Sequence, residues 1–161
     1  MRPGDTDTAS SVVRLFPDYA GTVLWVPHPV AYDSTALDAG LVTDLIRWEI
    51  EYYDALDADF AWRSPAVASA FTAAGVGLAL RLAVQLGSGF DIEFASYEAG
   101  VATRRFRSDF AADNPRAAAA FAAHAGSHSG THTRAVAWAT PVLATRLSVP
   151  PRGSASRRRQ G

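Results

Sequence analysis

The sequence contains neither cysteine nor lysine, although it runs to 161 residues. Without cysteine there can be no disulfide framework, no thiolate nucleophile and no thiolate metal site. Without lysine there can be no Schiff-base lysine and no phosphate-loop lysine. The sequence patterns of serine hydrolases, zinc proteases and dinucleotide-binding loops are also missing. We therefore predict no catalytic residues and no cofactor.

An excess of positive charge is lacking too. The formal net charge is −1 and the isoelectric point is near 6.4, so no basic field favours nucleic acid or an anionic membrane as a partner. Residues 1–10 lack the apolar region of a secretory signal. The apolar stretch at 135–149 is too short to span a bilayer and contains Pro141 and Arg146. We therefore expect a cytoplasmic protein.

What the sequence does contain fits one globular domain. Apolar residues make up 48% of the chain and charged residues 19%, an ordinary balance for a folded protein. Residues 1–10 show no periodic pattern and are predicted to be a disordered leader. Residues 11–126 are predicted to form a single α+β domain. Residues 127–161 lack sustained periodicity and are predicted to be a disordered tail.

Local patterns predict the first four elements of this domain. Two β-rich runs, at residues 12–16 and 22–26, flank turn-forming residues and predict a hairpin. Thr35, three residues before an aspartate, predicts the start of a helix as a weak form of the capping box. The Ser64-Pro65 pair predicts a second helix, because serine accepts hydrogen bonds at the N-cap. Proline is suited to the first helical position, because the N–H that it lacks would have no partner within the helix there.

A second hairpin is predicted at residues 90–107. Charged and apolar residues alternate there, and a register that pairs Ile92 with Phe106 also pairs Glu93 with Arg105. Gly100 is expected to take a left-handed conformation in the loop. A third helix follows at residues 115–126. The order β-β-α-α-β-β-α predicts a two-layer α+β fold, in which the two hairpins form one antiparallel sheet with the helices packed on one face.

Acidic and aromatic side chains crowd the end of the first helix and the segment that follows it. We call this group the acidic aromatic surface; it comprises Trp48, Glu51, Tyr52, Asp54, Asp57, Asp59 and Trp62. Three interpretations are open: a solvated surface, which is the usual role of such runs, a partner-binding patch, and paired carboxylates for acid–base chemistry. Carboxylates near a helix C-terminus are opposed by the helix dipole.

Arg104 and Arg105 are candidates for binding an anionic ligand. The hairpin register places Arg104 on the apolar face of the sheet, where a charge needs a partner. Either Arg104 lies at the sheet edge and reaches solvent, or it pairs with an acidic helix residue such as Glu49, or it anchors an anion between the sheet and the helices.

Three histidines at intervals of four residues, His124, His128 and His132, are weak candidates for metal ligands. On one helix face they could share a transition metal. The glycines and serines between them argue against a helix, and no carboxylate lies near them in the sequence to support the ligands. We therefore predict no functional metal site.

Three segments carry a resemblance to known sequences: FPDYAGTVLW, LIRWEIEYYDALDADFAWRSP and FASYEAGVATRRFRSD. Together they resemble a group of small uncharacterised proteins from high-GC bacteria. The resemblance covers roughly residues 12–125 and implies no particular chemistry.

Two functional hypotheses follow. The first is a non-enzymatic domain, immunity- or adaptor-like, that binds another protein through the acidic aromatic surface. The second is a small-molecule anion-binding protein or minor enzyme with a pocket lined by Arg104 and Arg105. The first is preferred, because the sequence contains no recognisable nucleophile or metal site.

Overall fold

The computed structural model describes residues 10–127 of the chain, and its elements confirm the α+β class. Their bounds are β1 Ser11–Leu15, β2 Leu24–Val26, β3 His28–Pro29, the 3-10 turn η1 Tyr32–Ser34, α1 Ala39–Asp54, α2 Pro65–Leu86, β4 Phe90–Phe94, β5 Arg104–Phe106 and α3 Pro115–Gly126. The predicted leader falls outside the described residues except for Ser10, and the predicted tail except for Ser127, so both remain predictions.

The sheet has the strand order β3-β2-β1-β4-β5. Both predicted hairpins form, but they join through β1 and β4, which run parallel. The prediction of a fully antiparallel sheet was therefore wrong at this junction. The two long helices return the chain to the end of the sheet where β1 starts, and the Ser11 amide donates a 3.1 Å hydrogen bond to the Gly89 carbonyl there.

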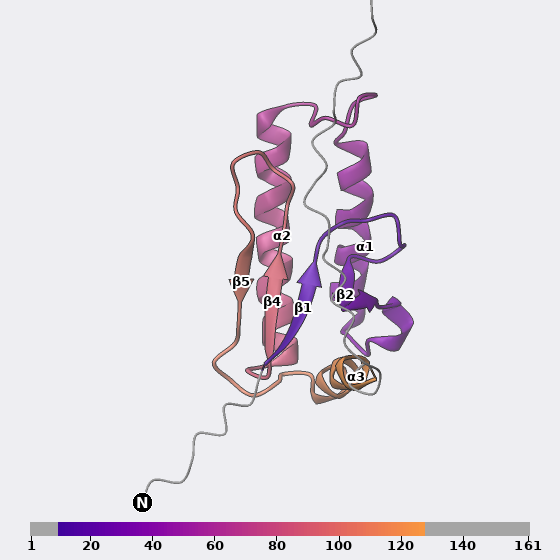
Figure 1. The fold of residues 1–161 in the computed structure, drawn as a ribbon, viewed down its shortest axis with the longest axis vertical. Coiled ribbons are helices and arrows are strands. Elements are labelled where there is room, and N and C mark those ends of the chain that lie inside the picture. Colours follow the sequence, from indigo (N-terminus) through magenta and orange to yellow (C-terminus); the bar gives the residue numbers. More distant parts are fainter. Residues whose placement is uncertain (1–9, 128–161) are drawn as a thin grey trace, which may run out of the picture. The chain divides into compact units, whose positions relative to one another are not determined.

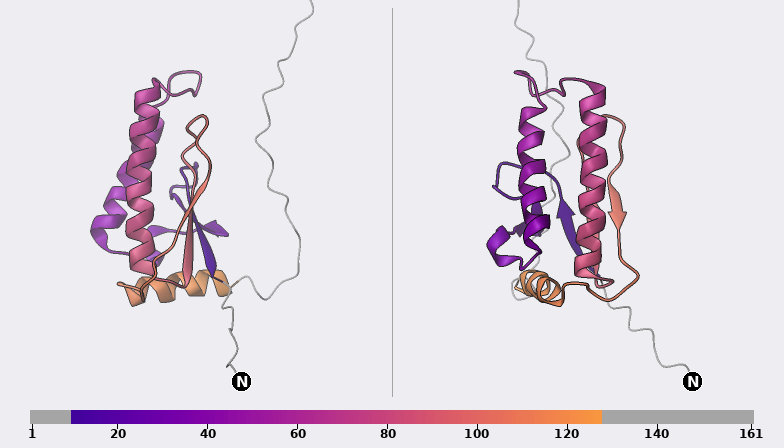
Figure 2. Two further views of the ribbon diagram at one scale, coloured as in Figure 1. Left: turned by 90° about the vertical axis from the view of Figure 1, so that its left-hand side faces the viewer. Right: turned by 180° about the vertical axis from the view of Figure 1, so that it is seen from behind.

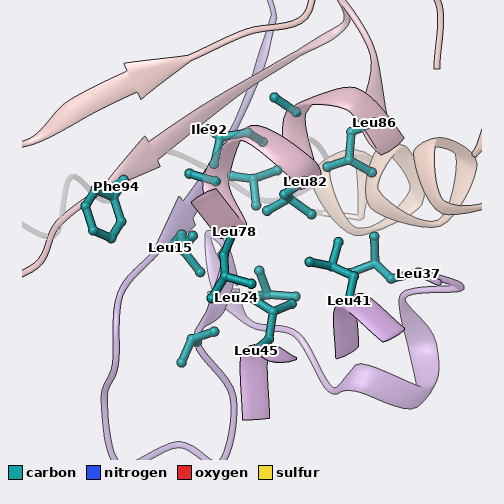
Figure 3. Packing of buried hydrophobic residues seen from close by; sticks show 14 of the residues in the cluster. Leu15, Leu24, Leu37, Leu41, Leu45, Leu78, Leu82, Leu86, Ile92 and Phe94 are labelled. Carbon is teal, nitrogen blue, oxygen red and sulfur yellow. The ribbon is translucent and has the colours of Figure 1, made fainter. Parts of the chain in front are cut away.

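Helices α1 and α2 lie side by side on one face of the sheet, as predicted (Figures 1 and 2). The third helix differs from the prediction, because α3 lies across one end of both layers (Figure 2) and contacts α2 and β2. The core lies between the helices and the sheet (Figure 3). Its largest fully buried side chains are Trp48, Phe94, Phe121, Leu15, Leu24, Leu41, Leu45, Leu82, Leu86, Ile92, Val13 and Val23. The opposite face of the sheet carries ion pairs between its strands.

The helix starts show where local signals are reliable. Ser64 caps α2 as predicted, because its hydroxyl accepts a hydrogen bond from the Val67 amide. The prediction that the first helix begins at Thr35 was wrong. The Thr35 hydroxyl donates to the Tyr32 carbonyl, within the turn η1. Asp38 caps α1 instead, since its carboxylate accepts hydrogen bonds from two amides of the first turn.

The β4–β5 hairpin has the predicted register. Glu93 lies opposite Arg105, and their side chains form an ion pair of 2.8 Å on the outer face of the sheet. Gly100 takes the expected positive φ, of 78°. The strands are shorter than expected, because β4 ends at Phe94 and a long loop follows in which Tyr97 also has a positive φ.

Among the described residues, α2 is long and apolar enough to cross a membrane. This is weak evidence for a span, because core helices pass the same criterion, and α2 packs its buried side against the sheet and α1.

Candidate protein-interaction surface

The acidic and aromatic residues gather where α1 ends and α2 begins. The connecting loop closes on itself through a bridge between Leu56 and Trp62. Inside this loop the Asp57 carboxylate accepts hydrogen bonds from the amides of Asp59 and Ala61, at 2.9 and 3.0 Å. Asp57 therefore shapes the loop rather than standing free for chemistry.

Phe60 lies at the tip of this loop. It has a φ of 60° and is 75% exposed. A bulky residue with positive φ is unusual and is held there only by its surroundings. The hydrogen bonds of Asp57 provide that restraint, and the Phe60 amide adds a bond of 3.1 Å to the Asp57 carbonyl. The loop thus presents a large apolar side chain to solvent on a restrained backbone.

Trp48 does not belong to the predicted surface. It is 2% exposed, stacks on Phe71 with ring centres 4.4 Å apart, and donates its indole N–H to the Phe71 carbonyl. The helical period places Trp48 on the stripe that faces the sheet, so it is a core residue. The prediction that it contacts a partner is corrected here.

A cluster of aromatic rings centred on Tyr52 adjoins the loop through Trp62. Its ring contacts those of Trp62 at 5.6 Å and Tyr97 at 5.9 Å. The neighbouring Tyr53 contacts Tyr19, which lies in the turn between β1 and β2. The Trp62 indole N–H donates to the Tyr97 carbonyl at 3.2 Å. Segments far apart in the sequence are therefore fixed against one another at this end of the domain.

Burial and nearby negative charge raise the pKa values of the tyrosines in this cluster. Burial raises the pKa of Tyr53 to about 12, with a further contribution from the charge of Glu49. Burial likewise raises the pKa of Tyr97 to about 12, with the charges of Tyr52 and Asp18 adding to it. These hydroxyls are neutral over the physiological range, so the cluster offers apolar area without charge of its own.

Negative charge surrounds the exposed rings. Within residues 10–127 none of Glu51, Asp54, Asp57 and Asp59 forms an ion pair. The nearby Arg63 donates to the Leu56 carbonyl instead. We call this region the loop-end surface; it comprises Tyr19, Glu51, Tyr52, Asp54, Asp57, Asp59, Phe60, Trp62 and Tyr97.

Two members of the loop-end surface were missed by the sequence prediction: Tyr19 and Tyr97. Tyr19 and Tyr97 lie in turns far along the chain from α1, and only the tertiary fold brings them there. Phe60 stood among the acids in the sequence, but its exposure depends on a positive φ that no local pattern reveals.

The two candidate ligand-binding arginines lie on the edge strand β5. Arg105 pairs with Glu93. Arg104 is exposed, and its guanidinium carbon lies 5.1 Å from the centre of the Phe106 ring. The charge on the apolar face is accommodated because an edge strand lets the side chain reach solvent. The position of Arg104 fits the interpretation in which it lies at the sheet edge and reaches solvent, and the anion pocket stays a prediction.

Of the three candidate histidines, only His124 lies within the described residues. His124 lies in α3, with its Nε2 atom 3.1 Å from the Ser34 hydroxyl. His128 and His132 lie outside the described residues. In the part of the chain that the structure describes, no group of three His, Asp or Glu side chains could hold a metal ion.

The chain was compared with known protein families. Residues 11–97 match the family described as Serratia CdiI immunity protein-like. The matched region runs from the start of β1 to the loop after β4, so it contains the loop-end surface. A search of the curated proteins finds no match.

Proposed function

The chain belongs to the Serratia CdiI immunity protein-like family, and we propose that it acts as an immunity protein, binding a protein toxin through its loop-end surface. It acts by occupying the toxin and not by catalysis. The predicted bacterial source and cytoplasmic location are parts of this proposal.

The observation that supports the proposal is the exposed Phe60, which lies on a restrained loop whose Trp62 packs against the Tyr52 ring. Aromatic side chains held in place lose little conformational freedom on binding and dominate the energy of many protein interfaces. Trp62, two residues along the same loop, is held by the Tyr52 ring at 5.6 Å and by its hydrogen bond to the Tyr97 carbonyl. Such an arrangement suits recognition of a preformed partner surface.

The charge of the domain adds to this. Residues 10–127 carry 14 acidic side chains against 8 arginines, although the whole chain is nearly neutral. The described part is therefore distinctly acidic, and the unpaired acids of the loop-end surface concentrate this charge beside Phe60. We infer that the toxin presents a basic surface with an apolar pocket at its centre.

The test is protection of growing cells. Each protein encoded next to this chain is produced alone and together with the full-length chain. We expect one of them to stop growth alone and the chain to restore it. If a growth-inhibiting neighbour is found and the full-length chain neither binds it nor restores growth, the proposal is wrong.

The surface is tested with a matched pair of variants. Phe60→Ala removes the exposed ring of the loop-end surface. Phe110→Ala removes a similarly exposed ring, 79% accessible, near the opposite end of α2. There the Phe110 carbonyl accepts a hydrogen bond from the Ser88 amide, just after the helix. We expect Phe60→Ala to weaken toxin binding by roughly 30-fold, as truncation of a central interface aromatic does, and Phe110→Ala to bind normally. Equal effects of the two variants would contradict the assigned surface.

A further inference from the structure

Two hollows follow one another along the seam between α1 and α2. One, of about 330 Å³, is lined by Glu51, Asp54, Ala55, Val67, Ala70 and Phe71. The next, of about 220 Å³, shares Glu51 and continues past Ala74 and Leu78 to Arg81. Because Ala70 and Ala74 are exposed, the two hollows form a groove open to solvent. We call it the interhelical groove.

The α2 side of the groove is low, and it is apolar except for Arg81 at its far end. Ala70 and Ala74 lie one helical turn apart, and Gly77 extends the row with nothing within 4 Å of the position of a Cβ atom. Small side chains at this spacing allow the backbone of another segment to approach closely. The buried Phe71 and Leu78 lie beneath this row.

The α1 side of the groove is charged, but unevenly. At one end Asp44 is neutralised by Arg81 at 2.7 Å and by Arg47 at 3.3 Å. At the other end Glu51 and Asp54 have no ion-pair partner among residues 10–127. The groove is therefore neutralised at the Asp44 end and negative at the Glu51 end, and Glu51 and Asp54 at that end also belong to the loop-end surface.

We propose that the interhelical groove receives one helix of the protein partner. That helix has small and apolar side chains facing Ala70 and Ala74, and arginine or lysine on the flank that faces Glu51 and Asp54. A helix suits the site better than a strand, because both walls are helices and present no free backbone groups for a strand to pair with. The inference rests on the proposed function and extends the toxin contact from the loop end along the helix layer.

The probe is a labelled amphipathic peptide with an alanine and leucine face and arginines along one flank. A peptide of the same composition in scrambled order is the control. We expect the full-length chain to bind the amphipathic peptide, and Glu51→Gln to weaken that binding about threefold and to reduce its dependence on salt. Equal binding of the scrambled peptide, or no binding of either, would overturn the inference.

A matched pair of variants tests the location. Ala74→Arg fills the groove and adds positive charge. Ala73→Arg makes the same change at an exposed position of α2 that lines neither hollow. We expect Ala74→Arg to weaken peptide binding at least about tenfold and Ala73→Arg to leave it unchanged, with circular dichroism confirming that both variants fold. If Ala74→Arg binds the peptide as tightly as the native chain does, the peptide does not bind in the interhelical groove and the inference is wrong.

This test is independent of the immunity test. If the chain protects cells and Ala74→Arg binds the toxin as well as the native chain does, the groove inference fails and the proposed function stands. If the peptide binds in the groove and no toxin is neutralised, the proposed function fails.

Discussion

Gly75 and Gly77 lie two positions apart in the same helix but have opposite surroundings. A Cβ atom at Gly75 would meet the Phe94 ring and would lie 2.6 Å from the Trp48 ring. A Cβ atom at Gly77 would have no atom within 4 Å. The first glycine is required by packing and the second is not, although both look alike in the sequence.

We therefore predict opposite effects of alanine at the two sites. Gly75→Ala should lower the free energy of unfolding by about 1–3 kcal/mol, because overpacking outweighs the gain in helix propensity. Gly77→Ala should raise it by about 0.5–1 kcal/mol through helix propensity alone. Urea unfolding of the two variants measures both values. A stabilised Gly75→Ala would show that the rings can move apart.

Tyr53 provides a second prediction at this scale. Its hydroxyl is buried and has no hydrogen-bond partner among the described residues. Tyr53→Phe removes that unsatisfied group, so the free energy of unfolding should stay the same or rise by up to about 1 kcal/mol. The native chain should also lose stability as the pH rises from about 10 to about 12, because the folded state holds the proton to a higher pKa than the unfolded state does. Tyr53→Phe should lose less stability over the same pH range. If the variant and the native chain lose the same stability between pH 10 and pH 12, the raised pKa does not belong to Tyr53.

At the scale of the elements, the strength of the β4–β5 hairpin depends on its ion pairs. The Arg107 guanidinium donates to the Asp91 carboxylate at 2.7 Å and, together with the Ser10 hydroxyl, lowers the pKa of Asp91 to about 2. Since the folded pKa lies below the unfolded value, the contribution to stability is present above about pH 4 and is lost as the pH falls towards 2.

Asp91→Asn tests this linkage. At pH 7 the variant should unfold at a lower urea concentration than the native chain, because it lacks the charged partner of Arg107. The difference should shrink as the pH falls below 4, where Asp91 of the native chain becomes protonated. A difference that stays constant from pH 7 to pH 2 would show that the carboxylate charge is not responsible.

The elements also show how far the sequence predicts the fold. The Ser64 cap and the register of Ile92 with Phe106 rest on neighbouring residues or short loops, and both were predictable. The parallel pairing of β1 with β4 was not, because it depends on the direction in which α1 and α2 return the chain. The start of α1 was misplaced because Thr35 and Asp38 are both competent caps and only the turn η1 decides between them.

At the scale of the whole molecule, the candidate site was likewise predictable only where its residues are close together in the sequence. The acids from Glu51 to Asp59 were predictable as a group, because they are contiguous in the sequence. The burial of Trp48 follows from helical periodicity, because it shares one face of α1 with the buried Leu41 and Leu45. The contribution of Tyr19 and Tyr97 required the tertiary fold.

The acidic character of residues 10–127 leads to a prediction about association. If a basic toxin is steered to the loop-end surface, the association rate should fall about tenfold or more between low and physiological salt. Asp59→Asn should reduce this salt dependence, whereas Asp113→Asn, near the start of α3, should not. Stopped-flow mixing at several salt concentrations measures the association rate. A rate that does not change with salt concentration would contradict electrostatic steering.

Hydrogen–deuterium exchange of the full-length chain, with and without the toxin, tests whether the loop-end surface is the toxin contact. We expect slower exchange on binding in three segments that meet at this end: residues 18–21, 51–63 and 95–101. Protection confined to β5 and the loop around Phe110, with these segments unchanged, would contradict this expectation.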